Sequence, residues 1–191
     1  MAQVYLMMNK PKGCVCSAAS DSHKTVYELL PPELQDLVKN AKRGHRLHTI
    51  GRLDADTTGL LLLTTNGMFS HRIAASEHIT KTYHATLWHQ VPLAEQDQYI
   101  TRAAQGLTLP PEKKAPEQTA APAKLTFTSQ TGCDITITEG KFHEVRRIFR
   151  ALGNEVTALE RTAIGPLQLP KDLLPGEYKP IPDDFLKILL Q

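Results

Sequence analysis

The segment GRLDADTTGLLLLTTNG, residues 51–67, constrains the fold of this chain more than any other. It places Asp54 and Asp56 a few residues before a run of four leucines. A continuous apolar run bounded by turn residues is typical of a buried strand, so we expect the two carboxylates at the start of a core strand. Because Asp and Thr are ordinary turn residues, the first interpretation is structural: Asp54 closes a turn, and Asp56 and the threonines satisfy backbone donors there.

Alternating apolar and polar residues predict further strands on both sides of this segment. In KTYHATLW the alternation places Tyr83, Ala85 and Leu87 on one face. Two other alternating segments surround QTGC and predict a hairpin. Strands outnumber helical crossovers, which predicts an α+β fold with a mainly antiparallel mixed sheet in two lobes, flanked by short helices. The predicted strands are 3–8, 81–88, 124–129 and 134–140.

Capping residues, prolines and helical spacing predict the helices. Residues 21–30 predict a short helix that Asp21 or Ser22 caps and that ends because Pro31 and Pro32 prevent its continuation. The Pro- and Ala-rich residues 108–124 cannot pack a core and predict a long loop. The other helices are predicted in 91–107, in 142–153 with Gly153 as the C-cap, and at the end of the tail 166–191, which otherwise holds loops and a strand.

Composition limits the class of protein. With 191 residues, of which 41% are hydrophobic, the chain can bury one core or two small lobes. No segment approaches roughly 18 consecutive apolar residues and the first residues lack a signal-peptide pattern, so we expect a cytoplasmic protein without a membrane span. The three cysteines leave an odd thiol, and Cys14 and Cys16 lack the second pair that a zinc site needs. Reduced, structural cysteines are therefore expected.

Positive charge is unevenly distributed, although the net charge is only +2. Between Asp36 and Asp54 there is no acid, and a second basic cluster is opposed only by Glu144. Either cluster alone is typical of a solvated face, but two of them favour a phosphate-rich partner. The first cluster contains Lys39, Lys42, Arg43, Arg46 and Arg52 with His45 and His48, and the second contains Lys141, Arg146, Arg147 and Arg150.

Chemical interpretations of the paired carboxylates compete with the structural one. A calcium loop that began at Asp54 would have Thr65 where it needs a glutamate, so this interpretation fails. A magnesium-dependent phosphatase with the pattern D-x-D-x-T should carry its nucleophile after an apolar strand of a parallel sheet, whereas HTIGRL precedes Asp54 and Arg52 would compete with the metal. A hydrolase triad lacks the G-x-S-x-G elbow.

The last interpretation is a carboxylate nucleophile that acts on a flipped-out nucleotide without a metal. It needs a carboxylate held ionised by a guanidinium, an aromatic surface on which a base can stack, and a basic rim for phosphates. The chain offers Asp54, an arginine of HEVRR, Tyr83 and the two basic clusters.

The segments NKPKG, GRLDADTTGLLLLTTNG, KTYHATL, EGKFHEVRRIFRALGNEVTALERTAIG and LPGEYKPI occur in the order and spacing of the Rsu-type bacterial pseudouridine synthases. The chain resembles this family from about Tyr5 to Pro182, and VCS, SHRI and LPGEY are most similar to the member that modifies 16S ribosomal RNA. The resemblance implies that a uridine of ribosomal RNA is isomerised to pseudouridine without a metal or an organic cofactor. The alternatives are a 23S specificity and, from another class, a non-catalytic RNA-binding protein of ribosome assembly.

The resemblance also implies the site residues. Asp54 is the catalytic carboxylate, Tyr83 packs against the target base with a role in proton removal, and Arg146 is the basic partner of the acid. An ionised carboxylate would stabilise positive character at the sugar C1′. His84 and His143 are expected to be neighbours without a catalytic role. The residues expected to bind RNA are Arg52 and Thr58, which flank the loop of Asp54, together with Lys10, Lys12, Arg43, Arg46, Lys81, Arg147 and Arg150.

Two features depart from the family pattern. Rsu-type proteins usually begin with a small S4 RNA-binding domain, whereas residues 1–191 are expected to be the catalytic domain alone. Glu144 stands where glutamine is common and adds a negative charge near Arg146. As partner we expect ribosomal RNA, 16S rather than 23S, free or within an assembling ribosomal particle; we expect no membrane contact and a monomeric protein.

Overall fold

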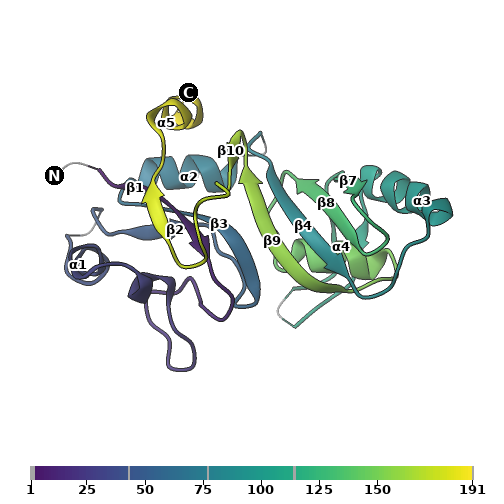
Figure 1. Cartoon of the computed structure of the whole chain (residues 1–191), viewed down its shortest axis with the longest axis horizontal. Helices are drawn as coiled ribbons and strands as arrows, with labels where there is room; N and C mark the ends of the chain where they lie inside the picture. Colours follow the sequence, from purple (N-terminus) through teal and green to yellow (C-terminus); the bar gives the residue numbers. More distant parts are fainter. Residues whose placement is uncertain (1–2, 43, 77, 114, 191) are drawn as a thin grey trace. The chain divides into compact units, whose positions relative to one another are not determined.

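The chain divides into two compact units in the computed structural model, which describes residues 3–42, 44–76, 78–113 and 115–190 (Figure 1). Unit 1 comprises Met1–Ser76 and Pro166–Gln191, and unit 2 comprises Glu77–Gly165. Each unit combines antiparallel strand pairs with short helices, which confirms the predicted α+β class. None of the helices in these described residues has the length and apolar character needed to cross a membrane.

The sheet of unit 1 is built on β3 (Thr57–Thr64), the strand predicted from the leucine run. Its four consecutive leucines are completely buried. Strands β1 (Tyr5–Lys10) and β2 (His48–Ile50) pair antiparallel with β3, and β11 (Tyr178–Pro180) pairs antiparallel with β1. The register places Lys10 opposite Gly59, so the end of β1 lies beside the start of β3.

The helices of unit 1 correct one prediction. The prediction of a helix over 21–30 was wrong. A single 3-10 turn, η1 (Val26–Leu29), forms there, and the capping box of Thr25 and Glu28 sets its start. Pro32 begins α1 (Pro32–Lys39) instead of only ending a helix, since proline is well accommodated in the first turn. A helix that we did not predict, α2 (Gly67–Ala75), starts at Asn66, whose side chain accepts a hydrogen bond from the Phe69 amide at 3.1 Å. The tail contains β10 (Leu167–Gln168), β11 and α5 (Asp183–Leu190).

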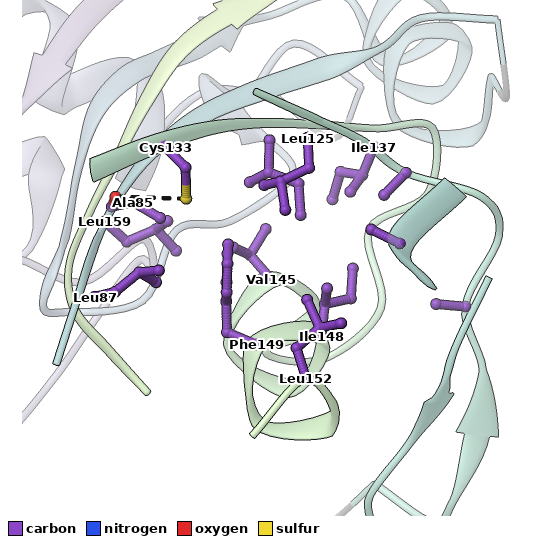
Figure 2. Packing of buried hydrophobic residues seen from close by; sticks show 14 of the residues in the cluster. Ala85, Leu87, Leu125, Cys133, Ile137, Val145, Ile148, Phe149, Leu152 and Leu159 are labelled. Atoms are coloured by element: carbon purple, nitrogen blue, oxygen red, sulfur yellow. Dashed lines mark hydrogen bonds between the residues drawn. The ribbon is translucent and has the colours of Figure 1, made fainter. Parts of the chain in front are cut away.

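The sheet of unit 2 has the strand order β9 (Val156–Ile164), β4 (Lys81–Leu87), β8 (Gly132–Ile137) and β7 (Lys124–Phe127), and neighbours pair antiparallel. Helix α3 (Leu93–Ala104) contacts β7. Helix α4 (Glu144–Ala151) packs its apolar side chains against the sheet, as Figure 2 shows. The strands and helices predicted in this half are confirmed. The core includes Ala85, Leu87, Leu125, Cys133, Ile135, Ile137, Val145, Ile148, Phe149, Leu152 and Leu159.

The predicted long loop 108–124 is better ordered than expected. Residues at its ends form the two-stranded pair β5 (Thr108–Leu109) and β6 (Gln118–Thr119), and Leu109, Ala120 and Ala123 are buried in the core of unit 2. The prediction that this segment cannot pack a core was wrong. Its small alanines are buried against the core of unit 2, whose other side chains come from elsewhere in the chain.

Candidate active site

The turn that carries Asp54 lies in unit 1 between β2 and β3. Gly51, with a φ of 69°, leads the chain out of β2, a conformation that favours glycine. Leu53 is buried, and its backbone contacts the Cys16 thiol on both sides. The sulfur accepts a hydrogen bond from the Leu53 amide at 3.4 Å and lies 3.6 Å from the Leu53 carbonyl oxygen. The Thr57 amide then donates to the Asp54 carbonyl at 3.1 Å. This turn leaves the side chain of Asp54 half-buried and that of Asp56 exposed.

Lys10 supports this turn from inside unit 1. Its side chain is completely buried, and Nζ donates to the carbonyl oxygens of Thr57 at 2.8 Å, Pro11 at 3.2 Å and Ala55 at 3.4 Å. Burial lowers the pKa of Lys10, while the nearby cysteines and the carboxylates of Asp54 and Asp56 act in the opposite direction. The buried ammonium therefore fixes the backbone on both sides of Asp56 and places a cation near both acids.

The aromatic candidate, Tyr83, lies on β4 of unit 2. Its ring is half-buried and packs against the core cluster, on the same face as Ala85 and Leu87, as the alternation predicted. Arg161 of β9 lies over this ring, with its guanidinium carbon 6.0 Å from the ring centroid. Arg161 was not singled out from the sequence. An arginine at a position where the strand alternation predicts an inward side chain is the signal that could have found it.

Arg146 lies on α4 of unit 2 and is half-buried. Its Nη1 donates to the Val156 carbonyl at 3.0 Å, which ties the helix to the start of β9. Helix α4 begins after His143, which adopts the left-handed conformation with a φ of 48°. Arg146 therefore lies in the first turn of a helix whose N-cap residue has a left-handed backbone conformation.

Glu112 connects the segment between β5 and β6 with both ends of α4. Its carboxylate lies 3.2 Å from Nδ1 of His143 and 3.3 Å from Nη1 of Arg150. Burial raises the pKa of Glu112, but the hydrogen bonds and charges of His143 and Arg150 outweigh it, so the net shift is downward. His143 therefore has a structural partner, and His84 similarly lies 2.8 Å from Asp134 on the neighbouring strand.

Three of the residues expected to bind RNA are buried in the structure. Lys10 holds the Asp54 turn, and Lys81 donates to the Thr138 carbonyl at 3.4 Å. The guanidinium of Arg147 is completely buried and donates to the carbonyls of Pro110 at 2.9 Å and Pro116 at 2.7 Å. These cations donate to backbone carbonyls inside the units, and their contact with RNA stays a prediction.

The other expected RNA contacts remain accessible. Lys12, Arg46, Arg52 and Arg150 are exposed, and Thr58 is half-buried at the start of β3. Arg43 lies outside the described residues. Among the residues that the structure does describe, we find no group of three or more His, Cys, Asp or Glu side chains placed to hold a metal ion.

Comparison with known proteins defines the class. A family model described as RNA pseudouridylate synthase matches residues 4–151. The chain belongs to this pseudouridine synthase family, and its members are enzymes that isomerise uridine in RNA.

Named relatives narrow the comparison. The chain is 39% identical over 188 residues to the ribosomal small subunit pseudouridine synthase A of Haemophilus influenzae, covering 98% of this chain and 74% of that protein. It is 40% identical over 181 residues to the enzyme of the same name from Escherichia coli K12, covering 94% of this chain and 71% of that protein. A crystal structure of a pseudouridylate synthase matches with a TM-score of 0.84 at 39% identity, covering 98% of this chain and 74% of that one. An archaeal box H/ACA Nop10–Cbf5 complex, at 16% identity and a TM-score of 0.55, shares the fold.

Proposed function

We propose that this chain converts one uridine of 16S ribosomal RNA to pseudouridine and that Asp54 is the nucleophile. The observation that carries the proposal is the Asp54 turn: a half-buried carboxylate held between the anchored Leu53 and the buried Lys10. A structural turn alone does not need a buried ammonium near two carboxylates, because burying a charge costs free energy. The relatives named for the small ribosomal subunit support 16S over 23S RNA.

The chemistry is an isomerisation that needs no other reactant. The bond between N1 of uracil and C1′ of ribose breaks, the freed base turns, and a bond forms between C5 and C1′. The proton lost from C5 is balanced by one gained at N1. Positive character develops at C1′ as the first bond breaks, and the Asp54 carboxylate captures or stabilises it.

Tyr83 and Arg146 have separate roles in this proposal. The half-buried ring of Tyr83 offers the turning base a flat surface, which suits a rotation better than a rigid set of hydrogen bonds. For Arg146 the proposal keeps the role that the family resemblance implies, a basic side chain that takes part in the reaction. The exposed Lys12, Arg46, Arg52 and Arg150 contact phosphates of the RNA.

Mapping of pseudouridine in 16S and 23S RNA tests the specificity. Wild-type protein is incubated with each RNA, free and within partly assembled ribosomal particles, and new sites are mapped at nucleotide resolution. The proposal predicts a single new site in 16S RNA. A site in 23S RNA would move the specificity to the large subunit, and binding without a product on any RNA would favour a non-catalytic assembly protein.

A further inference from the structure

The strand pairing around Tyr83 is irregular. Strands β4 and β9 are neighbours (Figure 1). Tyr83 of β4 lies opposite Arg161 of β9, whereas Thr82 lies opposite Ala163, so Thr162 is an extra residue on β9. Such a bulge bends one strand and changes the direction of the side chains beside it. The Thr162 hydroxyl donates to the Thr82 carbonyl at 3.3 Å, so the extra residue still bonds to the neighbouring strand β4. The bulge therefore lies at the residue that we propose to hold the target base.

Arg161 is built into this irregularity as a buried side chain. Only 4% of its surface is exposed, and its guanidinium carbon lies over the Tyr83 ring at 6.0 Å from the centroid. This distance is at the outer end of the range over which a cation is attracted by an aromatic face. Burying a guanidinium costs free energy, so the rest of the fold must compensate for it. The position of Arg161 beside the ring therefore belongs to the packed interior, unlike that of a mobile surface arginine.

The charge of Arg161 acts on the surroundings of Tyr83. Lys81, two residues earlier on β4, is also buried, and burial lowers its pKa. The charge of Arg161 lowers it further, while buried Glu144 acts in the opposite direction. Arg161 is therefore close enough to both neighbouring inward positions of β4 to influence them, by its contact at Tyr83 and by its charge at Lys81.

We infer that Arg161 is a positioning residue that acts through Tyr83. Its guanidinium keeps the ring in the orientation against which the freed uracil turns, and this inference rests on the proposed function of Tyr83. RNA binding precedes that rotation and does not require the fixed ring. Loss of Arg161 should therefore slow the chemical step and leave the KM for RNA unchanged.

Single-turnover kinetics on 16S RNA test this inference. We expect Arg161→Met to react about tenfold more slowly than wild type at unchanged KM, and Arg161→Lys, which keeps the cation, to recover most of the rate. Arg161→Gln is made in parallel in case the Met variant does not fold, and all variants are first compared by circular dichroism and thermal unfolding. Arg102→Met is the matched control: Arg102 is a half-buried arginine of the same unit that donates to the Ala151 carbonyl at 2.8 Å.

A double-mutant cycle separates action through Tyr83 from a general structural effect. In a Tyr83→Leu background, Arg161→Met should cause no further loss of rate, because the ring that it positions is absent. A folded Arg161→Met protein with the wild-type rate, or the same loss in the Tyr83→Leu background, would overturn the inference. If wild type itself forms no pseudouridine, the proposed function fails first and this inference with it, so the two failures are distinguishable.

Discussion

At the scale of single residues, Glu144 links pH to stability. Its side chain is 4% exposed, and burial raises its pKa above the usual 4.5, although an amide hydrogen bond from Lys141 opposes the shift. A raised pKa means that the folded protein prefers the protonated form, so the stability present below about pH 4.5 is lost as the pH rises through the folded pKa.

Glu144→Gln should therefore increase the free energy of unfolding more at pH 7.5 than at pH 4.5, because glutamine keeps the acceptor for the Lys141 amide without the charge. Urea unfolding at the two pH values measures the difference. Exposed Glu155→Gln is the control and should show little change at either pH. An equal effect of Glu144→Gln at both pH values would contradict the argument.

Lys10 makes a second prediction at this scale. Lys10→Met removes the donor to the buried Thr57 carbonyl, so we expect the free energy of unfolding to fall by about 1–3 kcal/mol. Pseudouridine formation should slow as well, because the Asp54 turn loses its support. Exposed Lys12→Met should change stability by less than about 0.5 kcal/mol. Equal stability of the Lys10 and Lys12 variants would show that the buried ammonium does not hold the turn.

The sequence predicted the position of Asp54 better than the roles of the cations. A carboxylate directly before a buried apolar strand is visible in the pattern, since both features are local. The sequence did not show that Lys10, Lys81 and Arg147 are buried, because charged residues usually lie at the surface. Their acceptors are backbone carbonyls, which have no sequence signature and are brought close only by folding.

At the scale of elements, Arg147 connects α4 with the β5–β6 pair. Its guanidinium donates to three carbonyls of that segment, those of Leu109, Pro110 and Pro116, and to the Gln118 side chain. Arg147→Met should leave these acceptors unpaired and lower the free energy of unfolding by about 2 kcal/mol or more. Arg147→Lys should not restore it, because an ammonium cannot reproduce the planar fork of donors.

Hydrogen exchange gives a local measure of this clamp. Amides of residues 108–119 should exchange faster in Arg147→Met, whereas Arg102→Met, which removes a hydrogen bond to the Ala151 carbonyl, should affect them less. Unchanged exchange in both variants would show that the segment is ordered by its alanines alone.

Elements with strong periodicity were predictable, and those that depend on a single capping contact were not. The leucine strand, the hairpin of β7 and β8, and helix α4 follow from repeated apolar positions. The helix prediction for residues 21–30 was wrong because Thr25 and Glu28, and not Asp21, cap the turn that forms. Proline at 32 was taken as a stop although it is also a good first residue of a helix.

At the scale of the whole molecule, the motifs of the family are divided between two units. Asp54 and its support by Lys10 belong to unit 1, while Tyr83, Arg146 and Arg161 belong to unit 2. Each unit contains antiparallel strand pairs of its own, so each can hold its residues on rigid strands and a short helix. The order and spacing of the motifs along the chain identified the family. This comparison needs only the sequence and not the contacts that the motif residues make after folding.

The central claim is that Asp54 is the nucleophile of pseudouridine formation. The most direct measurement is single-turnover formation of pseudouridine in 16S RNA by wild type, Asp54→Asn and Asp56→Asn, with folding checked for all three. Asp56 lies on the same turn and is exposed, so it is a matched control. We predict no product with Asp54→Asn and a rate within a few fold of wild type with Asp56→Asn. Equal activity of the two variants would contradict the claim.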